Sequence, residues 1–151
     1  IFVSLFYSGY FKIWSGTFAS FISIAILFPI VEYDILSKEI FIIVFFLIFI
    51  LSLYFINQFS SYTKSHDSSI IVIDEFLGVY LIFIFYDFVF YINSLITLLL
   101  IFFIFRFFDI SKIYPANIID KKITNSFGVL LDDIVAGVYT VITLFVLNVY
   151  S

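Results

Sequence analysis

The sequence predicts an all-α membrane protein, a polytopic bundle of about four to five membrane-embedded helices, and two observations lead to this prediction. Hydrophobic residues make up 64% of the 151 residues, only 12% are charged, and the mean hydropathy is +1.25. A soluble chain is about half apolar and about a quarter charged, and one of this length could not bury so much apolar surface. The apolar runs are also hydrophobic on every side and do not alternate, which argues against membrane-spanning strands.

Five apolar stretches approach the roughly 20 residues that a membrane-spanning helix needs. They cover residues 17–31, 40–56, 70–86, 89–108 and 134–150. The stretch 40–56 is the most uniformly apolar, whereas 17–31 is short and contains Pro29. No internal repeat or low-complexity linker divides the chain, so we expect residues 1–151 to form a single domain.

Charge and cysteine content exclude several classes of function. The formal net charge is −4, from 7 Lys and Arg against 11 Asp and Glu, and there is no cysteine. A nucleic-acid-binding protein would carry a basic stripe, so nucleic acid is not an expected partner. The absence of cysteine excludes disulfides, thiolate metal sites and cysteine nucleophiles.

The basic residues predict the orientation in the membrane. If all five stretches span and the N-terminus is cytoplasmic, one face receives six basic residues and the other receives only Lys38. The six are Lys12, Lys64, Arg106, Lys112, Lys121 and Lys122. Basic residues concentrate on the cytoplasmic side, so this face is predicted to be cytoplasmic. The same topology brings the polar stretches 8–17, 64–78 and 106–137 to that face, where we expect the functional site.

Two acidic pairs lie near the predicted cytoplasmic ends of membrane segments, where ionisable residues are costly and usually functional. Each pair is followed, one helical turn after one of its acids, by a glycine on the same face. The two sets are Asp74 and Glu75 with Gly78, and Asp132 and Asp133 with Gly137. The first pair is expected four and five residues into its segment, and the second is expected to open its segment. A glycine at these places would let a neighbouring helix or a ligand come close.

A third polar group follows the fourth apolar stretch. Arg106, Asp109 and Lys112 are spaced i, i+3, i+6 and would form one polar stripe if the helix continues. The loop before the third stretch supplies His66 and Asp67.

These residue types indicate a site that binds a metal ion and a phosphate group. The candidate carboxylates are Asp67, Asp74, Glu75, Asp109, Asp132 and Asp133. Hard oxygen ligands of this kind suit Mg²⁺ or Mn²⁺, and Mg²⁺ commonly acts together with phosphate groups. Arg106 and Lys112 would bind phosphate oxygens. Such a site at a membrane surface indicates phosphoryl chemistry on a lipid headgroup.

Four motifs resemble those of the phosphatidylglycerophosphatase A family. They are HDSSIIVIDEFLG at 66–78, FRFFDISK at 105–112 followed by Tyr114 and Pro115, GVLLDDIVAG at 128–137, and a weaker N-terminal motif with SG at 8–9 and SGT at 15–17. They occur in family order and at family-like spacing, and together cover about a third of the chain.

The resemblance implies a Mg²⁺-dependent phosphatase of the bacterial inner membrane that hydrolyses phosphatidylglycerophosphate to phosphatidylglycerol and inorganic phosphate. It implies catalytic roles for the same six acids. We expect Asp74, Glu75 and one or both of Asp132 and Asp133 to hold the metal. Arg106, Lys112, His66, Gly16 and Thr17 are the expected phosphate-binding residues.

Alternatives remain at the level of sequence. The reaction could proceed by direct attack of water, positioned by Asp67 with His66, or through an aspartyl-phosphate intermediate. The substrate could be another lipid phosphomonoester. A small ion carrier is a rival function of a different class, but it would need polar residues through the membrane, and 41–51 contains none.

Overall fold

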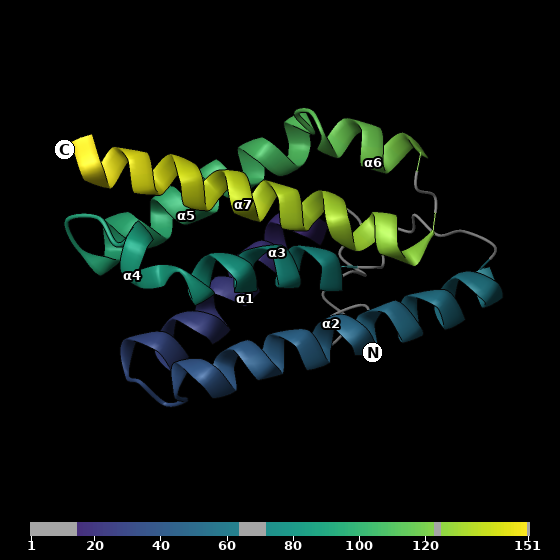
Figure 1. Cartoon of the computed structure of the whole chain (residues 1–151), viewed down its shortest axis with the longest axis horizontal. Coiled ribbons are helices and arrows are strands. Elements are labelled where there is room, and N and C mark those ends of the chain that lie inside the picture. Colours follow the sequence, from purple (N-terminus) through teal and green to yellow (C-terminus); the bar gives the residue numbers. More distant parts are fainter. Residues whose placement is uncertain (1–14, 64–71, 123–124, 151) are drawn as a thin grey trace.

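The computed structural model describes residues 15–63, 72–122 and 125–150, and all regular structure in these ranges is helical. The all-α prediction is therefore confirmed. The helices in chain order are α1 (Ser15–Glu32), α2 (Lys38–Thr63), α3 (Ile73–Ile84), α4 (Tyr86–Val89), α5 (Ser94–Ser111), α6 (Ala116–Lys122) and α7 (Ser126–Tyr150), as Figure 1 shows.

Three of these helices are long and apolar enough to cross a membrane, namely α2 over Lys38–Gln58, α5 and α7. Helix α1 contributes a shorter apolar stretch, Gly16–Glu32. The predicted segment 70–86 is not one continuous helix, because α3 has only 12 residues and ends at Ile84, where the short α4 follows. The count of four to five membrane-embedded helices stays a prediction.

At two helices, side-chain caps set the start at a residue other than the beginning of the predicted apolar run. Helix α5 begins at Ser94 and not near residue 89, since the Asn93 side chain accepts a hydrogen bond of 3.0 Å from the backbone N–H of Ile96. Helix α7 begins at Ser126, eight residues before the predicted start at 134. The side chain of Asn125 accepts 3.1 Å hydrogen bonds from the N–H groups of residues 127 and 128 there.

Helix α3 lies at the centre of the bundle. In Figure 1 it runs between α2 and α7, which lie on opposite sides of it, and it also contacts α1. Eight of its 12 residues are buried, including the fully buried Leu77, Val79 and Ile82. The acids in its first turn are therefore placed inside the bundle.

The outer surface of the bundle is apolar, as expected of a protein in lipid. Helix α2 leaves Ile43, Phe46 and Ile50 more than half exposed. Buried hydroxyls within the helices bond to their own backbone: Ser52 Oγ donates to Ile48 O at 2.7 Å, and Thr140 Oγ1 donates to Ala136 O at 2.8 Å. Such bonds satisfy polar groups where no water can reach them.

Helices α3 and α7 cross at two glycines. A Cβ atom added at Gly137 would lie 2.6 Å from the carbonyl oxygen of Gly78. A Cβ added at Gly78 would lie 2.7 Å from the carbonyl oxygen of Asp133 and 2.8 Å from the ring of Phe105. The two backbones are thus in direct contact, as the placement of the glycines in the sequence predicted.

Substituting Gly137→Ala is expected to destabilise the protein, by about 1–3 kcal/mol, because the new methyl group would meet backbone atoms that cannot rotate away. A loss of stability would be informative, because alanine is intrinsically the better helix former by about 0.8–1 kcal/mol and would stabilise the helix if there were room for its methyl group. The measurement is thermal unfolding of the purified protein in detergent. Val138→Ala, a change at the neighbouring exposed position, is the matched control and should have little effect. Unchanged or raised stability of Gly137→Ala would contradict the close crossing.

Candidate metal and phosphate site

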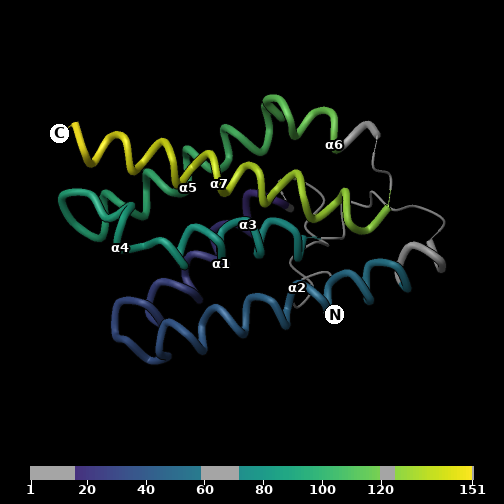
Figure 2. Tube along the Cα trace, viewed as in Figure 1, coloured from purple at the N-terminus to yellow at the C-terminus, as the bar shows by residue number. Residues whose placement is uncertain are grey.

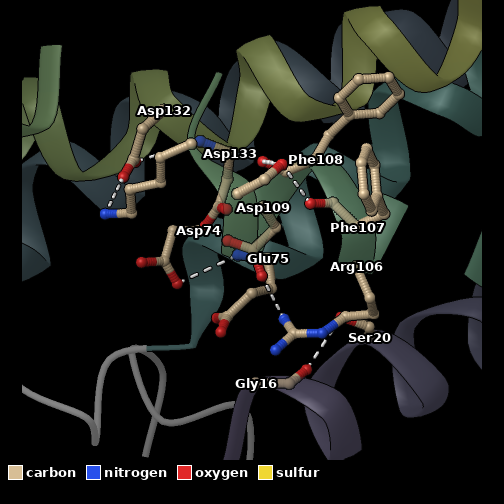
Figure 3. Close-up of polar contacts among 12 residues, drawn as sticks. Gly16, Ser20, Asp74, Glu75, Arg106, Phe107, Phe108, Asp109, Asp132 and Asp133 are labelled. Atoms are coloured by element: carbon tan, nitrogen blue, oxygen red, sulfur yellow. Dashed lines mark hydrogen bonds and ion pairs between the residues drawn. The ribbon is translucent and has the colours of Figure 1, made fainter. Parts of the chain in front are cut away.

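Three carboxylates from two helices converge at the α3–α7 crossing. Asp74 and Glu75 lie in the first turn of α3, and Asp133 lies in the second turn of α7. One oxygen from each of the three lies within 4.8 Å of the other two (Figure 3). These positions correct two expectations, because α3 begins only at Ile73 and α7 begins well before its acids. The convergence follows from the glycines one turn farther along each helix.

This cluster concentrates negative charge in a buried place. Asp133 is only 4% exposed, and its charge interacts with those of Asp74, Glu75, Asp109 and Asp132. One oxygen of Glu75, Oε2, is buried and has no hydrogen-bond partner among the described residues. Buried like charges repel one another and lose their hydration, so such a group needs a cation or protons to balance it.

Arg106 lies beside the cluster, in the last part of α5. Its Nη1 donates to Oδ2 of Asp109, one turn later on the same helix, and both side chains are mostly buried. Its Nε is buried without a partner in the described part of the chain. Figure 3 shows the guanidinium between Glu75 and the first turn of α1. Arg106 therefore offers a positive charge and an unused donor next to the carboxylates.

Lys112 does not continue the polar stripe predicted along α5, because the helix ends at Ser111. Lys112 adopts a left-handed backbone conformation, with φ of 41°, and its side chain turns toward α7. There its Nζ lies 2.9 Å from Oδ2 of Asp132. Asp132 is thus held by a lysine, and it stands outside the group of three converging carboxylates. It remains close enough to Asp74 for their charges to interact.

The first turn of α1 closes the site on another side. A Cβ added at Gly16 would overlap Oε1 of Glu75 and would lie 3.0 Å from Nη1 of Arg106. Ser20 Oγ donates to the carbonyl oxygen of Gly16 at 2.8 Å, one turn along α1. Thr17 follows in the same turn. Of the expected phosphate-binding residues, Gly16 is therefore brought next to Arg106, and Thr17 is its neighbour in the chain.

Phe105 is a contributor to the site that the sequence did not single out. Its side chain is fully buried, and its ring packs against Gly78 at the helix crossing. In a run of apolar residues only burial distinguishes it from its lipid-facing neighbours, and burial is not visible in the sequence.

Two predicted site residues, His66 and Asp67, lie outside the described residues. The other predicted acids are all found at the same end of the bundle, carried by the N-terminal parts of α3 and α7 and the C-terminal part of α5.

Comparison with known proteins identifies the family. The family model of phosphatidylglycerophosphatase A matches residues 1–148. The chain belongs to the phosphatidylglycerophosphatase A family. The family predicted from the sequence motifs is therefore confirmed, and with it that the protein is a phosphatase.

A curated relative agrees with this assignment. The phosphatidylglycerophosphatase A of Haemophilus influenzae is 36% identical over 117 residues, which cover 76% of this chain and 68% of the relative. No solved structure gives a significant match.

Substituting Gly16→Ala should lower phosphatase activity on the order of ten- to a hundredfold while leaving the fold intact. The new methyl group would displace the ends of the Glu75 and Arg106 side chains, which are able to move, and small misplacements in a site cost this much. Phosphate release and the midpoint of thermal unfolding are measured together. Phe21→Ala, on the exposed face of the same helix, is the control and should change neither by much. Full activity of Gly16→Ala would show that the contact with Glu75 has no catalytic importance.

Proposed function

We propose that the protein hydrolyses the terminal phosphate monoester of phosphatidylglycerophosphate, giving phosphatidylglycerol and inorganic phosphate, with Mg²⁺ as cofactor. The observation that carries this proposal is the convergence of Asp74, Glu75 and Asp133 beside the guanidinium of Arg106. Family membership and the name of the relative from Haemophilus influenzae support the substrate.

The residues present fit a magnesium ion. All three converging groups are carboxylates, the hard oxygen ligands that Mg²⁺ prefers, and Glu75 has an oxygen without a partner among the described residues. Asp74, Glu75 and Asp133 would hold the ion, and Asp132 would support it from its ion pair with Lys112. When bound, the ion supplies positive charge that balances the carboxylates and the phosphate.

Arg106 would bind and orient the phosphate group. The pairing of Nη1 with Asp109 fixes the guanidinium plane, and a phosphate oxygen would satisfy the buried Nε. Charge on the phosphate oxygens is stabilised by such fixed donors as the ester bond breaks. Lys112, Gly16 and Thr17 would complete the phosphate environment, from the end of α5 and the first turn of α1.

Water is the proposed nucleophile. Asp67, assisted by His66, would accept the proton of the water as its oxygen attacks phosphorus. The bond from phosphorus to the glycerol oxygen breaks, and that oxygen takes up a proton from solvent as it leaves. Both residues belong to the motif 66–78, which continues into α3 and includes two of the metal-binding acids. The rival route is an aspartyl-phosphate on one of the six acids, and detection of a phosphoprotein during turnover would replace direct attack by that route.

We place the site at the cytoplasmic face of the bacterial inner membrane. The six-to-one distribution of basic residues supports this orientation, and the three apolar helices support integration into a membrane. The glycerol headgroup would enter at the interface while the acyl chains remain in lipid beside the exposed apolar surface.

The distribution of polar groups favours a phosphatase over an ion carrier. The buried carboxylate cluster lies at one end of the bundle, and the charged residues at the other end are exposed and separate from it. Among the described residues, the buried hydroxyls of Ser23, Ser52 and Thr140 bond to carbonyl oxygens of their own helices and so do not line a path.

Asp74→Asn and Asp133→Asn should each lower phosphate release from phosphatidylglycerophosphate by about a hundredfold or more, because each removes a negative ligand worth several kcal/mol in metal-assisted transfer. The assay uses purified protein in detergent, with Mg²⁺ or with EDTA, and EDTA should abolish release from the wild type. Glu39→Gln, an acid exposed at the opposite end, is the matched control and should retain activity. Phosphatidic acid as a second substrate tests whether another lipid phosphomonoester is preferred.

A measurement without turnover separates metal binding from catalysis. Mg²⁺ at about a hundred times its dissociation constant should stabilise the wild type by about 2.7 kcal/mol, because it binds the folded state. Asp133→Asn should lose this stabilisation. Equal stabilisation of both proteins, or phosphate release that persists in EDTA, would remove the magnesium site from the proposal.

Arg106→Gln should lower kcat/KM on the order of a hundredfold while leaving stabilisation by Mg²⁺ unchanged, since the arginine would contact phosphate and not the metal. Arg106→Lys should recover only part of the loss, because a single ammonium cannot both pair with Asp109 and present a second fixed donor. Full recovery by lysine would indicate that charge alone matters at this position.

A further inference from the structure

A polar cavity lies at the end of the bundle opposite the three carboxylates. It has a volume of about 340 Å³ and is formed where the C-terminal end of α1, the first residues of α2, and the α3–α4 junction meet. Figure 2 shows this end of the chain, with the α1–α2 turn and α4 together, far from the first turns of α3 and α7. Nothing in the proposed phosphatase mechanism uses it.

The cavity has an acidic mouth. The exposed side chains of Glu32, Asp34 and Asp87 line it, with Lys38 as the one basic residue among its lining residues. Lys38 Nζ lies 3.1 Å from Asp87 Oδ2, so this pair is neutral. In the described part of the chain, Glu32 and Asp34 have no basic partner within ion-pair distance, which leaves two negative charges at the mouth.

The inner wall of the cavity is aromatic and contains an unused hydroxyl. Phe41, Phe83 and Tyr86 line it, each no more than 6% exposed, and the rings of Phe83 and Tyr86 stack at a centroid distance of 5.5 Å. The Tyr86 hydroxyl is buried and has no hydrogen bond within 3.5 Å among the described residues. Ser94 and Glu32 lie close enough to interact with it, and Ser94 donates to Glu32 at 3.3 Å.

We propose that this cavity binds an ammonium group, and that the natural source is the ethanolamine headgroup of a phospholipid in the leaflet opposite the catalytic site. Carboxylates and aromatic faces together are the groups that recognise organic ammonium ions. The buried Tyr86 oxygen adds an acceptor for an N–H donor. The volume lies at the small end of ligand sites, which suits a headgroup whose acyl chains remain outside in lipid.

The test is a lipid titration of the purified protein in detergent, followed by native mass spectrometry. Dihexanoyl-phosphatidylethanolamine should bind once per chain, with an affinity at least about tenfold higher than that of its N-acetyl derivative, whose amide nitrogen carries no charge. Free ethanolamine is added as a competitor. Displacement of the lipid by ethanolamine at similar concentration would identify a free amine as sufficient. Displacement only by lipid, with the tenfold preference between the two lipids intact, would identify the lipid headgroup as the source of the ammonium group.

Paired variants locate the binding. The double substitution Glu32→Gln with Asp34→Asn should weaken phosphatidylethanolamine binding about tenfold or more, because it removes both unpaired charges. Asparagine suits position 34, where φ is 47°. Glu39→Gln makes the same type of charge change at the same end of the molecule but outside the cavity, and should bind like the wild type. The midpoint of thermal unfolding verifies that each variant is folded.

Two results would overturn the proposal: equal binding of the two lipids by the wild type, or equal binding of phosphatidylethanolamine by the double variant and by Glu39→Gln. The inference does not rest on the phosphatase proposal, because the readout is binding and the cavity shares no residue with the carboxylate cluster.

Discussion

The backbone contact between α3 and α7 at Gly78 and Gly137 is the constraint on which the rest of the site depends. At this crossing there is no room for even one methyl group on either helix. Since side chains three or four residues apart share a helix face, the acids one turn before each glycine must then lie close together. The close approach of the two helices therefore brings the two halves of the carboxylate cluster together. Phe105 packs against the same crossing and so ties α5, with its arginine, to the pair.

The charges at this end of the bundle are arranged so that each group outside the central cluster has a defined partner. Arg106 is held by Asp109, and Lys112 is held by Asp132. The three converging carboxylates have no such basic partner among the described residues, and that imbalance is what favours a cation there. The buried Nε of Arg106 is a donor without a partner among the described residues, and the buried Oε2 of Glu75 is an acceptor without one. A phosphate oxygen would satisfy the donor, and a metal ion would satisfy the acceptor.

The two ends of the bundle differ from its middle in the way that a lipid environment requires. Between them the helices are apolar outside, and their buried hydroxyls bond to their own backbone. Polar groups that need water, ions or headgroups are confined to the ends, where these are available. The carboxylate cluster and the cavity beside Tyr86 are therefore separate sites, and each has chemistry suited to what is found at a membrane surface.

The sequence by itself determined the helical class, the family and the end of the bundle that carries the acids. Composition and hydropathy predict membrane helices, and short motifs of specific residues indicate the family and the site. Helix boundaries and partners were decided only by tertiary structure. Asn125 starts α7 well before its acids, and the left-handed turn at Lys112 sends that lysine to Asp132 instead of extending the stripe with Arg106. Helix capping and ion pairing depend on which groups lie close together in space, and the hydropathy pattern along the chain carries no information about that.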